Sequence, residues 1–334
     1  MARCLRKAKE PLFLVGVDMD PTYLPLCPVD VSYVVPAASD PETYIAALAH
    51  LTEKLHIDFL YPQKDQEVLI LAQHRERFPG KLWLPPADVI ALSQDKEQCR
   101  QFLAKQGVPV PVGLLLEREH DLALLQEKGL DTLCWVRKIR GSGSEGARLC
   151  RSIEEVRVWV SENNGWGNFM ASEFLPGRIF GWDSIWKDGV LLACQAKERL
   201  RYGMETSPSP RSKYTTAIRS VHEPHAEEVA QRAVTAIMSK PDGIFTVDMR
   251  ENAQGQPMVT EINAGRFLTS STILFEKTGF LFPYDVVNIN LGNMPEHLPC
   301  HHPVHPGQYI LAGILADPIL CTERDFQIPS WREA

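Results

Sequence analysis

The sequence lacks the features that mark a secreted, membrane-spanning or disulfide-bonded protein. Its eight cysteines are dispersed, without a CxxC pair, which argues against a disulfide framework or a structural zinc site and favours a reducing compartment. No apolar run approaches membrane-spanning length, and Tyr309 to Ala316 is among the longest. No secretory signal peptide is recognisable. We therefore expect a cytoplasmic protein with no membrane partner.

An excess of positive charge is also missing. The formal net charge is −7 and the pI is near 5.8, so a nucleic-acid-binding surface is not favoured. Hydrophobic residues make up 44% of the chain and charged residues 23%, which is ordinary for a globular protein. A chain of 334 residues is long enough for two or three domains with a large core.

The first 92 residues alternate between short apolar runs and amphipathic segments. Asp40 and Pro41 supply a helix cap and a proline at the first helical position. The βαβα order predicts a parallel sheet with helices on its faces. Residues 2–9 look like the end of a helix with no strand before it, so we expect the first strand of this region to be missing. The expected strands cover 12–17, 32–35, 57–61 and 81–84, and the expected helices cover 41–56 and 66–78.

A second unit begins near Ser93. The run Ser-Gln-Asp-Lys-Glu predicts the start of a helix that Gly107 ends. Further along, Ser152 and Glu155 have the spacing of a capping box and predict another helix. A shorter helix is expected over 122–128. These elements predict a second folded unit after the first 92 residues.

Two apolar strands in this unit flank a glycine-rich loop, Gly141 to Gly146. Its sequence GSGSEG matches G-x-G-x-x-G, but a dinucleotide site needs that motif between a strand and a helix. The loop also lacks the Gly-Lys-Ser/Thr ending of a P-loop. A hairpin loop rich in glycine and serine can still surround phosphates with backbone N–H groups. Two interpretations stay open, a phosphate-binding loop and an ordinary surface turn.

The most informative stretch runs from Gly243 to Phe267. Two apolar runs are separated by the polar turn Glu-Asn-Ala-Gln-Gly-Gln-Pro, which predicts a β-hairpin. Glu261 and Asn263 share one face of the second strand, and Asp248 can face them from the first. Three oxygen donors on rigid strands suit Mg²⁺, which prefers few protein oxygens together with substrate phosphates. A solvated hairpin would not explain a carboxylate and a carboxamide beside apolar neighbours.

Taken in order, these motifs resemble the ATP-grasp superfamily. The chain has an Asp-Lys helix start, an Arg-Lys-x-x-Gly-Ser-Gly-Ser loop, a Glu-Phe-Leu-Pro-Gly hinge and an Asp…Glu-x-Asn set. It looks most similar to carboxylate–amine ligases and carbamoyl-phosphate-synthase-large-subunit-like proteins. The resemblance implies an α/β protein with an ATP-grasp fold, in which two α+β lobes clamp ATP, preceded by a truncated Rossmann-like pre-ATP-grasp domain with a parallel sheet. The implied domains are the pre-ATP-grasp domain at 1–92, the small lobe at 93–165, and the large lobe with a C-terminal extension at 166–334.

The resemblance also implies roles for individual residues. Asp248, Glu261 and Asn263 match the Mg²⁺ ligands, with Mn²⁺ as an alternative ion. Arg266 matches the basic residue that steadies the transferred phosphoryl group, and Arg137 matches the residue that contacts the α-phosphate and adenine. The other residues implied in nucleotide binding are Lys96, Lys138, Gly141, Ser142, Gly143, Ser144, Glu173, Phe174, Leu175 and Asp183.

Three positions depart from the family pattern. Lys138 stands where the family often has proline. Many members have an acid shortly after the hinge that bonds the ribose, whereas Asp183 is the first clear acid here. The segment from Asn263 to Arg266 is one residue longer than the Asn-Pro-Arg of the family. The ribose contacts are therefore the least defined part of the implied site.

The implied reaction joins two small molecules. The γ-phosphoryl group of ATP would pass to a substrate carboxylate, and an amine would then displace phosphate, leaving ADP and a new C–N bond. Closure of loop 141–146 would exclude water. Two alternatives stay open: a carbamoyl-phosphate-synthase-like or carboxylase-like subunit, and a non-catalytic nucleotide-binding protein, which the intact Asp-Glu-Asn set disfavours. The sequence identifies neither substrate, and it leaves a homodimer open.

Other polar groups carry weaker signals. The segment Cys300-His-His-Pro-Val-His is expected to be an irregular loop because of its prolines, and its spacing alone is unspecific for a metal. Lys197 and Arg199 lie on one expected strand and can reach phosphates. Asp65 follows the expected strand over 57–61, at the edge where open α/β sheets bind ligands, although helix capping explains it equally well.

Overall fold

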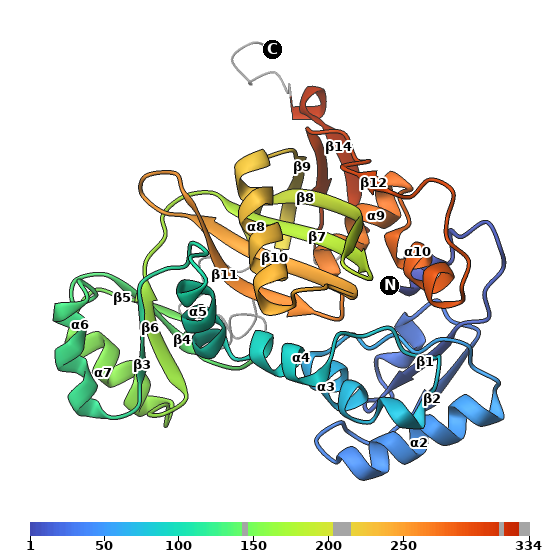
Figure 1. Cartoon of the computed structure of the whole chain (residues 1–334), viewed down its shortest axis with the longest axis horizontal. Helices are drawn as coiled ribbons and strands as arrows, with labels where there is room; N and C mark the ends of the chain where they lie inside the picture. The colour runs from blue at the N-terminus through green and yellow to red at the C-terminus, as the bar shows by residue number, and fades with distance from the viewer. Residues whose placement is uncertain (142–145, 203–214, 314–316, 327–334) are drawn as a thin grey trace.

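The computed structural model describes residues 1–141, 146–202, 215–313 and 317–326. Figure 1 shows an N-terminal region, a small lobe and a large central sheet with helices against it. Within the described ranges, no helix is both long and apolar enough to cross a bilayer. All eight cysteines are free thiols.

The N-terminal region is built on a pair of parallel strands. Asp40 caps the first long helix as expected, because its Oδ1 accepts the Thr43 N–H at 3.5 Å, and Pro41 stands at the first helical position. Ile45 and Leu48 on this helix pack into the main core. The elements are β1 (Val15–Asp18), β2 (Val31–Val34), α2 (Pro41–Lys54) and α3 (Asp65–Gln73), with 3₁₀ turns at Leu24–Leu26 and Arg75–Arg77.

The sheet of this region, which is described throughout, is smaller than the sequence predicts. Residues 57–61 and 81–84 do not form strands; they are joined where Leu60 donates its N–H to the Lys81 carbonyl at 2.8 Å. Pro62 follows the first segment, and proline supplies no backbone donor to a ladder. The expectation of four strands is therefore wrong, and two are formed.

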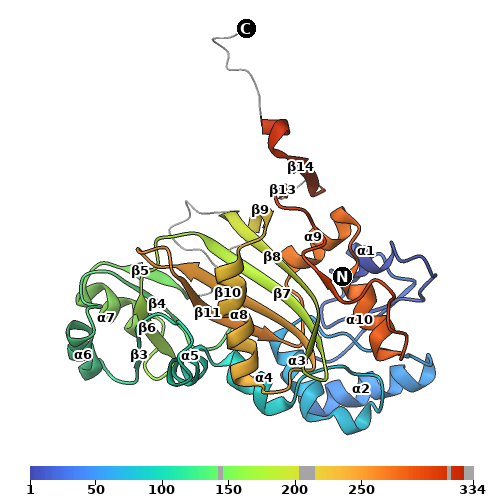
Figure 2. The ribbon, with the colours of Figure 1, turned by 45° about the horizontal axis from the view of Figure 1, so that its top comes forward.

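The start of the chain packs away from these strands. Helix α1 (Ala2–Leu5) lies against α9 (Thr269–Thr278) and α10 (Phe282–Asn290), where Cys4 joins a core cluster with Phe275. Figure 2 shows the N-terminus beside these helices. The missing first strand stays a prediction.

A helix that the sequence pattern did not predict, α4 (Ala87–Gln94), leads into the small lobe. Ser93 lies in its last turn and donates its hydroxyl to the Ile90 carbonyl at 2.8 Å, so it cannot cap the next helix. Asp95 does so instead, because its side chain accepts an N–H of the first turn at 3.0 Å. The helix start expected at Ser93 is therefore wrong, and α5 covers Lys96–Lys105.

The small lobe is a four-stranded antiparallel sheet packed against two helices. The strands around the glycine-rich loop form the expected hairpin, and Ser152 caps its helix by accepting the Glu155 N–H at 3.2 Å. The last strand of the lobe ends at Glu173, so the small lobe extends past residue 165. In sheet order, the strands are β3 (Gly113–Leu116), β6 (Phe169–Glu173), β4 (Cys134–Lys138) and β5 (Arg148–Cys150); the helices are α6 (Ala123–Glu127), after a 3₁₀ turn at Glu119–Leu122, and α7 (Ile153–Glu162).

The large lobe is an eight-stranded sheet with a long helix, α8 (Pro224–Ile237), across one face (Figures 1 and 2). Seven of its strands are consecutive antiparallel neighbours around the expected hairpin and its partners. In sheet order, the strands are β11 (Pro257–Ala264), β10 (Gly243–Glu251), β7 (Ile179–Lys187), β8 (Val190–Tyr202), β9 (Thr215–Val221), β13 (Gln308–Leu311) and β14 (Ile319–Thr322), followed by a 3₁₀ turn at Glu323–Phe326; β12 (Cys300–His301) pairs with β8.

The two faces of this sheet differ because side chains alternate along each strand. One face carries Trp182 and Val247, which pack with α8 in the main core. The other face carries Asp183, Lys197 and Asp248, all of them charged side chains. The polar groups of the central strands therefore gather on the face away from α8.

Candidate active site

The hairpin of β10 and β11 brings three oxygen-bearing side chains together. Asp248 and Glu261 lie directly opposite each other in the strand register, and Thr246 lies opposite Asn263. A register shift follows Asp248, and such a bulge re-aims neighbouring side chains. The expected hairpin and the shared face of Asp248, Glu261 and Asn263 are confirmed.

Cations from two parts of the chain surround these acids. The Arg199 guanidinium of β8 lies 2.6 Å from Asp248 Oδ1, and Lys96 Nζ at the start of α5 lies 3.2 Å from Glu261 Oε1. Arg137 of β4 donates to the Thr260 carbonyl at 2.9 Å. Lys96 and Arg137 therefore connect the small lobe directly to β11.

Electrostatics distinguishes the two carboxyl groups. Burial raises the pKa of Asp248, and the charge of Glu261 adds to this while Arg199 opposes it. Burial would also raise the pKa of Glu261, but Lys96 and Arg137 hold it below its ordinary value. Adjacent carboxylates that disfavour each other's charge attract a divalent cation.

Two buried donors next to these acids have no hydrogen-bond partner among the described residues: Asn263 Nδ2 and Arg137 Nε. Buried polar atoms are nearly always satisfied, so such orphans call for an explanation. An acceptor-rich anion, such as a nucleotide phosphate, supplies the missing acceptors. Burial also lowers the pKa of Arg137, although nearby acids oppose this, so an added anion would stabilise its charged form.

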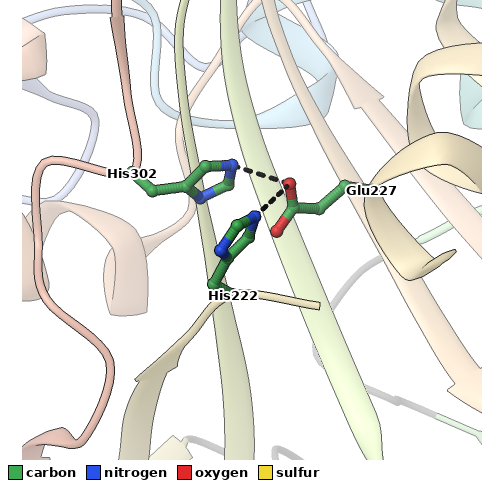
Figure 3. A group of neighbouring side chains, drawn as sticks. All are labelled: His222, Glu227 and His302. Carbon is green, nitrogen blue, oxygen red and sulfur yellow. Dashed lines mark ion pairs between the residues drawn. The ribbon is translucent and has the colours of Figure 1, made fainter. Parts of the chain in front are cut away.

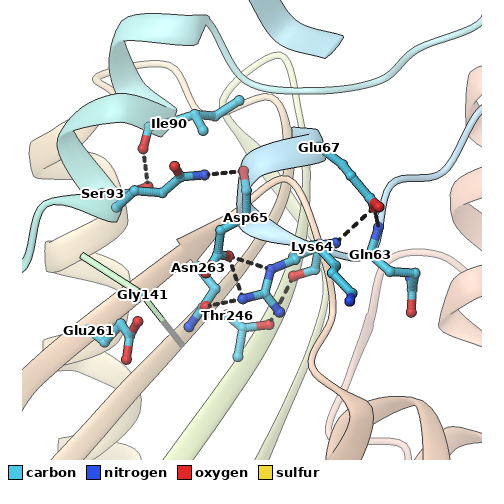
Figure 4. Close-up of polar contacts among 12 residues, drawn as sticks. Gln63, Lys64, Asp65, Glu67, Ile90, Ser93, Gly141, Thr246, Glu261 and Asn263 are labelled. Atoms are coloured by element: carbon cyan, nitrogen blue, oxygen red, sulfur yellow. Dashed lines mark hydrogen bonds and ion pairs between the residues drawn. The ribbon is translucent and has the colours of Figure 1, made fainter. Parts of the chain in front are cut away.

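Arg266 lies between the large lobe and the N-terminal region. It donates from Nε to Asp65 Oδ1 at 2.8 Å and from Nη2 to Asn263 Oδ1 at 2.9 Å. Figure 4 shows Asp65 close to Asn263 and Thr246. The capping of α3 is provided by Glu67, which accepts the backbone N–H of Lys64 at 3.1 Å, so Asp65 is free to serve as the partner of Arg266.

Lys96 also holds the start of the glycine-rich loop. Lys96 Nζ donates to the Gly141 carbonyl at 2.7 Å, and the Lys96 N–H bonds the Ile139 carbonyl at 2.9 Å. Ser142, Gly143 and Ser144 lie outside the described residues. The hairpin setting of this loop agrees with the argument against a dinucleotide site.

Lys138 does not join this group. Alternation along β4 places it on the opposite face from Arg137, where it lines a separate cleft of about 490 Å³ with Asp95 and Asn168. Neighbouring residues of one strand cannot both face β11, so Lys138 lies apart from Arg137, and its role in nucleotide binding stays a prediction.

The hinge is held by close packing. The Arg250 guanidinium lies 5.5 Å from the ring centroid of Phe174, and Leu175 is buried. Glu173 Oε2 accepts the backbone N–H of Val112 at 3.4 Å. Gly177 is required, because a Cβ there would lie 2.5 Å from the Cβ of Glu251. This glycine lets the hinge approach the end of β10.

Asp183 is not available to a ribose. It is fully buried, with an ion pair to Lys197 and hydrogen bonds from Thr246 at 2.8 Å and Ser271 at 2.7 Å. Gly181 makes this pair feasible, since a Cβ at that position would lie 3.1 Å from Lys197 Nζ. The expected nucleotide role of Asp183 is therefore corrected to a structural one.

Two residues near the site were not predicted. Arg250 shares the face of Asp248, and the period of two along β10 would have indicated it. Ser271 reaches Asp183 from α9, and its sequence gives no local signal. Of the two cationic side chains on β8, Arg199 forms an ion pair with Asp248 and Lys197 forms one with Asp183.

The sequence matches no protein-family model and no curated protein sequence. Solved structures are similar in fold. L-amino acid ligase from Bacillus licheniformis matches with a TM-score of 0.67 and 16% identity over 90% of this chain and 73% of that one. The biotin carboxylase domain of 2-oxoglutarate carboxylase from Hydrogenobacter thermophilus matches with 0.69 and 15% over 92% and 70%.

A third match is carboxyaminoimidazole ribonucleotide synthase from Aspergillus clavatus, with a TM-score of 0.68 and 15% identity over 93% of this chain and 78% of that one. At identities this low the similarity shows the fold alone, so the chemistry of this chain is argued from its own residues. Together with the two-lobed architecture and the acid-bearing hairpin, these likenesses establish that the chain has the ATP-grasp fold.

Proposed function

We propose that the protein is an ATP- and Mg²⁺-dependent ligase that activates a carboxylate as an acyl phosphate for attack by an amine. The observation that carries this proposal is the hairpin set of Asp248, Glu261 and Asn263, which faces cations from both lobes beside two unsatisfied buried donors. That combination suits a divalent cation and a polyphosphate together.

Asp248, Glu261 and the Oδ1 of Asn263 would hold the ion, which neutralises phosphate charge when it is bound. Arg137 would bind the nucleotide phosphates through its unsatisfied Nε. Lys96 would exchange Glu261 for a phosphate oxygen while keeping its bond to the Gly141 carbonyl. In this exchange Lys96 keeps a negatively charged partner and Glu261 gains the ion, so neither buried charge is left alone.

Arg266 supports the choice of a carboxylate as acceptor. Its guanidinium already binds the carboxylate of Asp65 from the N-terminal region, and guanidinium groups bind carboxylates and phosphates with the same fork of donors. A substrate carboxylate in place of Asp65 would lie beside Asn263 and the phosphate-binding cations. Arg266 would then stabilise charge on the transferred phosphoryl group.

Two of the similar structures contain an adenine nucleotide. The Hydrogenobacter thermophilus domain is a dimer with MgADP and bicarbonate, and the Aspergillus clavatus synthase is complexed with ATP. For this chain, ATP, Mg²⁺, the carboxylate and amine substrates and a homodimer are parts of the proposal. A carboxylase-like reaction with bicarbonate is the alternative that the test must distinguish from the ligase reaction.

The test is ADP release by the full chain with Mg²⁺ and ATP, screened over amino acids and small carboxylic acids, with and without added amines. Release that needs both a carboxylate and an amine supports the ligase. Release that needs bicarbonate alone supports the carboxylase-like reaction. ATP binding by calorimetry without turnover under any condition would indicate a non-catalytic nucleotide-binding protein.

A further inference from the structure

Three side chains converge beside α8, two of them close in sequence and the third some distance along the chain. His222 follows β9, Glu227 lies in the first turn of α8, and His302 follows β12. Glu227 Oε2 lies 2.6 Å from His302 Nε2 and 3.9 Å from His222 Nε2. Figure 3 shows both imidazoles pointing at this carboxylate. Their rings are stacked, with centroids 4.7 Å apart.

This His–Glu cluster (His222, Glu227 and His302) is separate from the hairpin acids. His302 is anchored to Cys194, whose side chain packs in the core under α8. Asp248 lies on the opposite face of the sheet. The two groups therefore belong to different faces, and the cluster takes no part in the reaction proposed above.

The backbone holds the donor atoms in place. Glu227 Oε1 accepts the Glu223 N–H at 3.0 Å, which fixes its carboxylate at the helix start. The His302 N–H donates to the Cys194 carbonyl at 2.8 Å. His302 has a φ of 52°, a left-handed conformation that non-glycine residues rarely adopt and that tends to mark functional positions.

We propose that His222, Glu227 and His302 bind Zn²⁺. Two imidazole nitrogens and one carboxylate oxygen are a donor set that zinc takes, whereas Mg²⁺ prefers oxygen alone. Metal–ligand bonds of about 2.0–2.2 Å place tetrahedral donors about 3.3 Å apart. The distances of 2.6 Å and 3.9 Å lie on either side of that value, so small side-chain rotations suffice.

Solvent reaches the cluster on the side of His222. The side chain of His222 is 53% exposed, whereas those of His302 and Glu227 are 14% and 8% exposed. Zinc enters from the side of His222 and rests on the two buried ligands. Bound in this way, the ion ties the segment after β12 to the junction of β9 and α8.

The test uses the full chain, stripped with a chelator and dialysed. Zn²⁺ is titrated against a chromogenic chelator, and Co²⁺ is added separately to record its visible d–d absorption. We expect one tight Zn²⁺ and a tetrahedral-type Co²⁺ spectrum. His302→Ala and His222→Ala should each weaken zinc binding at least about tenfold, as the loss of a ligand exceeds the loss of a supporting contact.

Matched controls come from the same segments. His301→Ala removes an exposed neighbour of His302, and His225→Ala removes an exposed histidine of α8; both should bind zinc like the wild type. Glu227→Gln keeps the side-chain volume and serves if His302→Ala fails to fold. Zinc affinity that is unchanged in Glu227→Gln and His222→Ala, or absent in the folded wild type, would overturn the proposal. Nucleotide binding is measured in parallel, so a failure here is distinguishable from a failure of the ligase proposal.

Discussion

The large sheet presents two polar groups on opposite faces, and they differ in how the chain builds them. The hairpin group places Asp248, Glu261 and Asn263 within one supersecondary unit, with oxygen donors in register. The His–Glu cluster is assembled from three segments, with nitrogen donors around one carboxylate. The donor chemistry differs accordingly, since oxygens alone suit Mg²⁺ and mixed nitrogen and oxygen donors suit Zn²⁺.

This difference explains why the hairpin group could be predicted from the sequence and the His–Glu cluster could not. Strand alternation and a polar turn are local, so they predicted the shared face of Glu261 and Asn263 correctly. His222 and His302 are brought together by the pairing of β12 with β8, which no local pattern specifies. The following experiments test the comparison, from the largest expected effect to the smallest.

Asp248→Asn and Glu261→Gln should each lower Mg²⁺-dependent ATP turnover by about 10²–10³-fold, because each removes a carboxylate that would hold the ion that neutralises phosphate charge. Zinc affinity should not change. The measurements are ADP release and zinc titration on the same preparations. Glu228→Gln, on the exposed side of α8, is the control.

Turnover near wild type in both hairpin variants would remove the basis of the ligase proposal. Asparagine and glutamine are preferable to alanine here, because they keep the side-chain volume and an oxygen that still accepts a hydrogen bond, from Arg199 in the case of Asp248. Removing one charge of a buried pair destabilises a protein by about 3–5 kcal/mol, so each variant is first checked to be folded.

Lys197→Met should lower the free energy of unfolding by about 3–5 kcal/mol, because it leaves the fully buried Asp183 without its cation. The measurement is chemical denaturation followed by circular dichroism. Lys187→Met is the control; its side chain is 40% exposed beside Asp242, and a surface pair contributes at most about 1 kcal/mol. Equal stability of the two variants would contradict a structural role for Asp183.

Arg137→Ala should weaken ATP binding by about 1.5–3 kcal/mol, the range for a hydrogen bond to a charged group. Calorimetry with ATP and with NADH is the measurement. Arg148→Ala, on the neighbouring strand β5 and exposed, should bind ATP like the wild type. Tight NADH binding with no ATP binding would reverse the assignment of this loop.

A buried thiol lies near an acid of each polar group, and both thiols pack in the main core. Burial, with a contribution from Glu261, raises the pKa of Cys99 to about 12. Burial, with a contribution from Glu227, raises the pKa of Cys194 to about 12. Neither thiol should react with a disulfide reagent at pH 8 in the native protein, whereas the exposed Cys27 should.

These raised values also fix the sign of a pH effect. A thiol that keeps its proton in the native state contributes stability that is complete below the unfolded pKa of about 8.5. That stability is lost as pH rises through the native value of about 12. Unfolding free energy that rises between pH 8.5 and 10 would contradict this assignment.

The sequence predicted the fold class and the shared face of the three hairpin side chains, but not the packing between distant segments. Caps, turns and strand alternation act within a few residues. The sequence therefore predicted the helix caps at Asp40 and Ser152 and the shared face of the hairpin acids. Asp183 is buried against Lys197, and its burial depends on distant segments that the local sequence does not identify. Two of the four expected N-terminal strands, 57–61 and 81–84, do not form; a short apolar run does not show whether a partner strand is present.

The position of Lys96 has a thermodynamic consequence. One ammonium group bonds both Glu261 on the large lobe and the Gly141 carbonyl at the start of the glycine-rich loop. An ion that competes for Glu261 therefore changes the free energy of holding that loop, and the coupling is reciprocal. Any ligand that draws the loop away from Lys96 must alter ion affinity by the same factor. For the ion and nucleotide proposed above, Lys96 would couple the two affinities, whichever of them binds first.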